Sequence, residues 1–178
     1  MSYKAGELVE DKGIYMGTAP IFKNLGLSQC FAVFAQHGDF MVMGGPERAA
    51  LEFKDAVDCV AQQNTHQGYD ALIIEDEESL VEAIKSGRYQ GQWVLPSYGI
   101  MKNVIVPQKD KGAFKDSFQK SAVNSFTGPE HYWVLSDGPD MPESANRFCI
   151  DNNRFLTCLK ADEIEGSVRS VRLEPVAP

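Results

Sequence analysis

The sequence lacks the features that mark several large classes of protein. It has no basic stripe, since 17 Lys and Arg residues against 25 Asp and Glu residues give a net charge of -8. That balance argues against binding along a nucleic-acid backbone, where cations replace counterions. It also has no run near the roughly 18 apolar residues that a membrane-spanning helix requires, and no apolar segment typical of an export signal at its start. We therefore expect a soluble protein, made in the cytoplasm without a recognisable signal peptide and without membrane insertion.

Cysteine is sparse and irregularly spaced. Cys30, Cys59, Cys149 and Cys158 form no Cys-x-x-Cys pair and have no secretory context, so thiols in the protein interior are the expected state. Cys149 and Cys158 would share one face of a predicted hairpin. A cross-strand disulfide between them would require that they lie directly opposite each other.

The sequence offers no assembled set of catalytic or metal-binding residues. The histidines His37, His66 and His131 stand singly, without the His-x-Glu or His-Glu-x-x-His spacing of metal sites. Among the cysteines only Cys149, near Arg147, has a cationic neighbour that could lower its pKa, and a structural role is favoured for it. We expect no enzyme activity and no cofactor or metal.

What the sequence does have is enough apolar residues for one core. Its 178 residues are 43% hydrophobic, which predicts a single domain over 1–178. Short apolar and aromatic runs at 13–18 and 30–36, bounded by turn-forming residues, predict two early strands.

Three helices are predicted in the middle of the chain. A helix over about 49–62 follows from apolar residues at helical spacing, namely Phe53, Ala56, Val57, Val60 and Ala61. A second helix over 76–86 begins with Asp76 as its N-cap and has acidic residues in its first turn. Ser97 is expected to cap a third, short helix that Pro107 ends.

The last third of the sequence favours β structure. Four short segments rich in aromatic and β-branched residues predict an antiparallel meander; they lie at 131–137, 147–153, 154–160 and 167–174. Asn152 and Asn153 tolerate left-handed backbone angles and predict a tight hairpin. Strand parity then predicts one core-facing set, in which Phe148, Ile150, Phe155 and Leu159 share a face with Thr157.

Several short motifs support a resemblance to a known fold. They are "AVDCVA" at 56–61, "WVLPS" at 93–97, "YW" at 132–133 and "VRSVRLEP" at 168–175. In this order they resemble the uncharacterised C-type-lectin-like domains of bacteria and phages, over roughly residues 50–175. The resemblance implies an α+β fold in which two main helices pack on a twisted antiparallel sheet and the terminal strand returns beside the first. Trp93 and Trp133 would then be buried, with their indole N–H groups hydrogen-bonded.

The sequence also departs from that family. Many such domains have a cysteine where this chain has Ser170, so Cys59 loses the partner that the resemblance would imply. The acid-Pro-Asn and Trp-Asn-Asp motifs that hold calcium and sugar in animal lectins are missing. Sugar binding is therefore not implied.

The resemblance implies binding rather than catalysis. The expected function is a non-enzymatic binding or assembly module, either structural or receptor-binding, in a virion or surface assembly. Its partners would be proteins or further copies of itself, with a cell-surface receptor or glycan as further candidates. Two alternatives remain: an enzyme related to the formylglycine-generating oxidases, which use a paired-cysteine copper site, and a calcium-dependent glycan-binding protein.

Two long connections, at 108–128 and 136–146, are the candidate contact surface, because loops of that length are commonly functional. The first offers aromatic side chains as anchors, although packing under the loop is an equal alternative for them; they are Phe114, Phe118 and Phe126. The second is rich enough in oxygen ligands to suggest calcium, but it lacks the regular ligand spacing of a compact calcium loop, which favours a solvated loop; these residues are Asp137, Asp140, Glu143 and Asn146.

Overall fold

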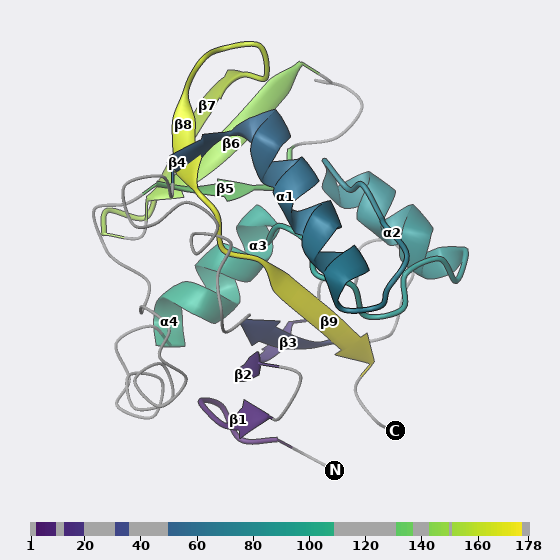
Figure 1. Ribbon diagram of the computed structural model, residues 1–178. Coiled ribbons are helices and arrows are strands. Elements are labelled where there is room, and N and C mark those ends of the chain that lie inside the picture. The colour runs from purple at the N-terminus through teal and green to yellow at the C-terminus, as the bar shows by residue number, and fades with distance from the viewer. Residues whose placement is uncertain are drawn as a thin grey trace.

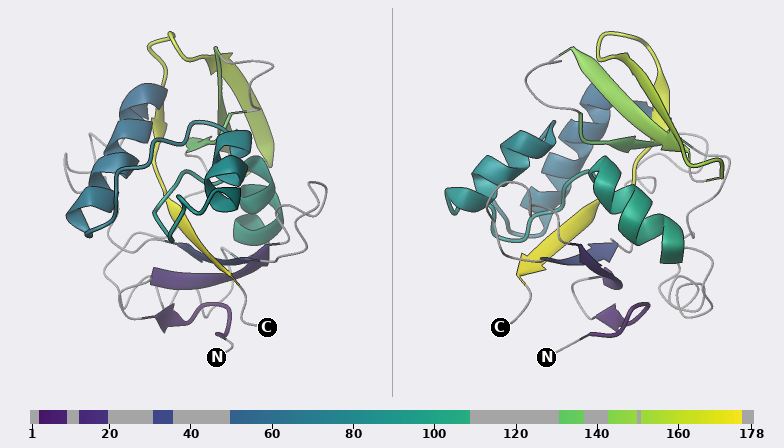
Figure 2. Two further views of the ribbon diagram at one scale, coloured as in Figure 1. Left: turned by 90° about the vertical axis from the view of Figure 1, so that its right-hand side faces the viewer. Right: turned by 180° about the vertical axis from the view of Figure 1, so that it is seen from behind.

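The computed structural model shows an α+β protein, with two sheets and three helical regions among the residues that it describes (Figure 1). The residues that the structure describes are 3–9, 13–19, 31–35, 50–108, 131–136, 143–149 and 151–175. Figure 2 shows the two sheets at opposite ends of the molecule, with the helical run from α3 to α4 between them. The α+β class predicted from the sequence is confirmed.

The smaller sheet joins the two ends of the chain. Its strand order is β1-β2-β3-β9, and every neighbouring pair is antiparallel. The strands are β1 (Leu8–Val9), β2 (Gly13–Ala19), β3 (Phe31–Ala35) and β9 (Val171–Pro175). Both predicted early strands are confirmed, and the terminal strand returns beside them as a neighbour of β3.

The larger sheet is mixed. Its order is β4-β8-β5-β6-β7, and β5 pairs with β8 in parallel through Tyr132 and Ser167, whereas the other neighbours are antiparallel. The strands are β4 (Ala50–Glu52), β5 (His131–Val134), β6 (Ser144–Cys149), β7 (Arg154–Leu159) and β8 (Glu165–Ser167).

The predicted antiparallel meander is therefore wrong for its fourth segment. After β7 the chain crosses to the far side of β5, forms β8 there, and continues into β9 of the other sheet. The crossing needs a close approach at Gly166, where a Cβ atom would lie 2.9 Å from the indole nitrogen of Trp133. The hairpin between β6 and β7 is confirmed, because Asn153 has a φ angle of 53° in its turn.

The first two helices begin for different reasons. α1 (Phe53–His66) starts later than predicted, because 50–52 pair with β8 as β4. α2 (Glu77–Lys85) is confirmed, with the Asp76 carboxylate accepting a hydrogen bond from Ser79 N at 2.7 Å.

The third helical region is longer than the sequence predicts. Ser97 Oγ accepts a hydrogen bond from Ile100 N, which confirms the predicted cap. The region continues as α3 (Tyr98–Ile100), η4 (Met101–Ile105) and α4 (Val106–Gln108). Pro107 lies inside it rather than ending it. The Val106 N–H donates back to Met101 O in a π-type turn just before the proline, which has no N–H and so needs no acceptor.

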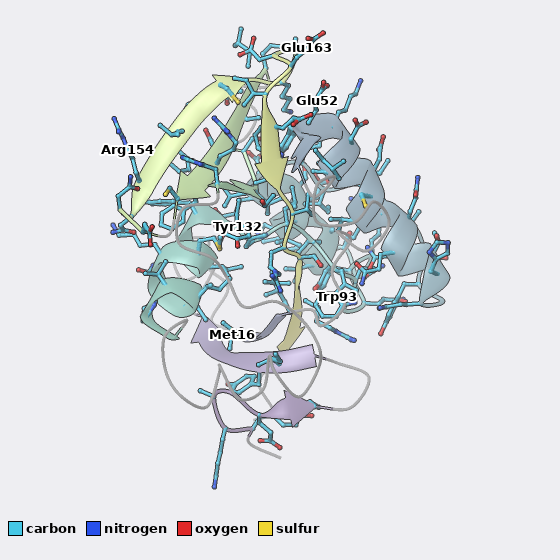
Figure 3. All side chains as sticks on the ribbon, turned by 60° about the vertical axis from the view of Figure 1, so that its left-hand side comes forward. Met16, Glu52, Trp93, Tyr132, Arg154 and Glu163 are labelled. Atoms are coloured by element: carbon cyan, nitrogen blue, oxygen red, sulfur yellow. The ribbon has the colours of Figure 1, made fainter. Side chains whose placement is uncertain are left out.

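Both tryptophans are core residues, as predicted. Trp93 is 2% and Trp133 is 1% exposed. Their indole N–H groups donate to Gln67 Oε1 and Leu51 O, each at 2.6 Å. Figure 3 shows Trp93 inside the molecule together with Met16 and Tyr132, whereas Arg154 and Glu163 lie outside.

The predicted core face of the hairpin is only half right. Phe148 is fully buried and Phe155 packs against the core, but Leu159 is 57% exposed. Thr157 on the same face is exposed as well, so only the Phe155 end of β7 packs against the core. Ile150 lies outside the described residues.

Candidate functional site

A frame around Glu75 fixes both ends of the predicted acidic loop at 136–146. The Glu75 backbone C=O accepts hydrogen bonds from Ser136 N at 2.9 Å and Ser136 Oγ at 3.0 Å. The Glu75 carboxylate pairs with Lys160 Nζ at 2.9 Å. Lys160 in turn donates its backbone N–H to Glu143 O at 2.7 Å. The two ends of the loop are thus held beside the start of α2.

The structure separates the predicted acidic ligands. Glu143 is exposed just before β6, whereas Asn146 is fully buried inside β6, in register with Val134 and Thr157. The prediction that Glu143 and Asn146 lie together on one contact surface is therefore wrong, because Asn146 faces the interior of the protein. Within the described ranges, no three His, Cys, Asp or Glu side chains gather as a metal site. The other predicted site residues lie outside the described residues, and they are Phe114, Phe118, Phe126, Asp137 and Asp140.

Sequence reasoning missed an aromatic surface beside the hairpin. Tyr98, the first residue of α3, is 36% exposed. Its ring packs edge-on against Phe148 at 5.7 Å and Phe155 at 4.8 Å between centroids. Lys102 Nζ lies 5.6 Å from the centre of the Tyr98 ring, one helical turn further on. A partly exposed tyrosine with a neighbouring cation is suited to contact with a partner. Its only sequence signal was the Ser97 cap, which places Tyr98 at the start of a helix.

The two arginines of the "VRSVR" motif are interior residues. Arg172 is 6% exposed and donates from Nη2 to the Tyr69 hydroxyl at 3.1 Å. Its guanidinium lies 5.6 Å from the Tyr69 ring and 5.8 Å from the Trp93 ring. A Cβ at Gly91 would lie 2.9 Å from Nη2, so this close approach needs glycine. Arg172 therefore joins β9 to the WVLPS segment at 93–97. Arg169, three residues earlier in the chain, is also buried, at 2% exposed.

The hairpin register keeps its two cysteines apart. Cys149 pairs with Arg154 and Cys158 pairs with Ala145. The two thiols share a face, as predicted, but they are four residues apart along the strands, or about 13 Å. Cys59, Cys149 and Cys158 are all present as thiols. A disulfide between Cys149 and Cys158 is not compatible with this geometry.

The positive charge of Arg147 acts on the thiol of Cys158. Burial raises the pKa of the Cys158 thiol, and the positive charge of Arg147 acts in the opposite direction without reversing the shift. Cys158 Sγ lies 3.5 Å from Ala145 O, as a weak donor. A thiol with a raised pKa is a poor nucleophile, because less of it is thiolate at neutral pH. This position therefore favours a packing role.

Alkylation of the unreduced, denatured protein is expected to label all four cysteines. The register between β6 and β7 holds Cys149 and Cys158 too far apart to bond. Peptide mass spectrometry is the measurement, with a reduced sample as the control. A cross-linked peptide pair containing Cys149 and Cys158 would show that the register is wrong.

No protein-family model matches this chain, and no curated protein matches it in sequence. None of the helices in the described ranges has the length and apolar character that a membrane crossing requires. The contacts described above are therefore the basis for assigning a function.

Proposed function

We propose that this chain is a non-enzymatic binding and assembly module with a C-type-lectin-like fold, acting in a phage-type virion or surface assembly. The observation that carries the proposal is the convergence of the motifs behind the resemblance. Val94 of the WVLPS motif (93–97) exchanges backbone hydrogen bonds of 2.8 Å with Val171 of the VRSVRLEP motif (168–175). Tyr132 pairs with Ser167, next to that motif. Segments far apart in the sequence thus meet in one core.

The module would present its contact surface at the end of the molecule formed by the larger sheet. The Glu75 frame fixes the base of the 136–146 loop, and a rigid base that carries a long loop is a common arrangement for recognition. The partly exposed Tyr98 adds an aromatic contact beside the hairpin. The partners we propose are proteins, including further copies of this chain, with a cell-surface receptor or glycan as further candidates. The protein would be associated with a virion or assembly after synthesis in the cytoplasm.

The geometry gives less support to the two alternatives. A copper site of the oxidase type needs two adjacent thiolates, and Cys149 and Cys158 are held about 13 Å apart by the strand register. A calcium site using Glu143 and Asn146 together would need Asn146 to leave the interior of β6.

Light scattering on the purified chain is expected to show a species larger than the monomer. Replacing Phe114 or Phe118 by alanine is expected to shift that species toward the monomer, because an interface loses most affinity when an aromatic anchor is truncated. Tyr3→Ala is the control, since Tyr3 packs on Tyr15 of the smaller sheet. It should leave the assembly size unchanged.

Two results would contradict the proposal. A folded monomer unaffected by Phe114→Ala and Phe118→Ala would remove the assembly role of the 108–128 loop. Catalytic turnover that is abolished by Cys149→Ser would refute the binding function as a whole.

A further inference from the structure

The two ends of the 136–146 loop leave the larger sheet in different directions. β5 and β6 pair up to Val134 and Asn146. Beyond that pair, the end of β5 turns toward the start of α2, where Ser136 forms a parallel bridge with Asp76. The start of β6 stays paired with the end of β7 instead. The base of the loop is therefore divided between two parts of the protein.

The first part is the start of α2. The Glu75 C=O accepts both hydrogen bonds from Ser136. The next residue, Asp76, caps the helix by accepting from Ser79 N at 2.7 Å, and its C=O accepts from Leu80 N at 3.2 Å. These bonds hold Glu75 and Ser136 to the first turn of α2 as one unit.

The second part is the turn that follows β7. The Lys160 N–H donates to Glu143 O at 2.7 Å, which ties the turn to the start of β6. Asp162 closes the turn, because its carboxylate accepts from Leu159 N at 2.9 Å and its N–H donates to Leu159 O at 3.0 Å. Glu143 and Lys160 are therefore held together as a second unit.

An ion pair joins the two units. The Glu75 carboxylate lies 2.9 Å from Lys160 Nζ, and the two side chains are 36% and 20% exposed. Lys160 Nζ also lies 5.5 Å from the centre of the Phe53 ring, so α1 supports the position of the ammonium group. Because both charged groups are partly withdrawn from water, removing one charge leaves the other poorly solvated.

We propose that the Glu75–Lys160 ion pair is a latch at the base of the 136–146 loop. While the pair is formed, Ser136 and Glu143 are held at a fixed separation. When it breaks, the turn after β7 separates from the start of α2. A surface with a fixed base loses less conformational entropy on binding, so the latch controls how tightly the module binds. The role in binding rests on the proposed function, whereas the latch itself does not.

Hydrogen exchange of single backbone amides, measured by NMR on the full chain, tests the latch. Each variant is measured on the opposite side of the ion pair. Lys160→Met keeps a long apolar side chain against Phe53 and should make the Ser136 N–H exchange about tenfold faster. Glu75→Gln should do the same for the Lys160 N–H. A tenfold change corresponds to about 1.4 kcal/mol.

Three controls separate the ion pair from general destabilisation. The N–H groups of Val94 and Val171, which bond to each other's carbonyl groups, should exchange at the wild-type rate in both variants. Lys54→Met makes the same change at an exposed position of α1 and should leave the Ser136 N–H unaffected. The double variant Glu75→Lys with Lys160→Glu keeps opposite charges, so it should restore slow exchange of the Ser136 N–H.

The outcomes separate the latch from the assembly role. If Lys160→Met leaves exchange at Ser136 unchanged, or if the charge swap does not restore it, the latch is wrong while the assembly function stands. Sedimentation velocity tests the effect on binding: Lys160→Met should weaken self-association and Lys54→Met should not. Faster exchange with unchanged association would show that the latch does not control binding. If the wild type is a folded monomer but exchange responds as expected, the latch stands and the assembly role is wrong.

Discussion

Replacing Asn64 by leucine is expected to lower the free energy of unfolding by about 2–6 kcal/mol, at about 1–3 kcal/mol for each buried polar group left without a partner. Asn64 is fully buried in α1. Its Oδ1 accepts from Trp93 N at 2.6 Å, and its Nδ2 donates to Trp93 O at 2.8 Å. Leucine fills a similar volume but satisfies neither backbone group of Trp93.

Urea unfolding followed by tryptophan fluorescence measures this effect. Asn103→Leu is the matched control, because Asn103 is exposed on η4. It should change the stability by no more than about 0.5 kcal/mol. If Asn64→Leu were as stable as the control, the two hydrogen bonds between the Asn64 side chain of α1 and the Trp93 backbone would not contribute to stability.

The second large effect is expected for Gly166→Val, which should destabilise the fold by about 2–6 kcal/mol. A Cβ at this position would lie 2.9 Å from Trp133 Nε1 and 3.0 Å from Arg147 Cδ. Overpacking of this kind costs about 1–3 kcal/mol. The displaced indole would also lose its 2.6 Å hydrogen bond to Leu51 O, at a further cost of about 1–3 kcal/mol.

A thermal melt followed by circular dichroism gives the comparison. Gly99→Ala is the control, because a Cβ there meets only Ser97 Oγ at 3.8 Å, an ordinary contact, and Gly99 lies in α3. Alanine should stabilise the helix by up to about 1 kcal/mol. A Gly166→Val protein that melts with the wild type would mean that β8 does not pack so closely against Trp133.

Local signals predicted the elements that depend on neighbouring residues. The Asp76 cap and acidic first turn predicted α2, and the Ser97 cap predicted the start of α3. The hairpin was predicted by Asn152 and Asn153, because few other residues accept a left-handed backbone angle. The start of α1 was missed, because the pairing of 50–52 with β8 decides it and that partner is over a hundred residues away.

The candidate site was predicted less well than the fold. Composition identified an acidic stretch, but whether its side chains meet depends on strand register, and β6 turns Asn146 inward while Glu143 stays outside. The frame around Glu75 and the pairing of its carboxylate with Lys160 join residues 85 positions apart. No local pattern predicts a contact of that separation.

By itself, the sequence determined that this protein is α+β, that α2 and α3 begin at capping residues and that its two tryptophans are buried. These features depend on side-chain periodicity, cap chemistry and hydrophobicity, which act over a few residues. Only the tertiary structure decided that β8 pairs in parallel with β5 and that Cys149 and Cys158 stay apart. Sheet order and register decide these features, because a shift of one residue moves every side chain of a strand to the other face.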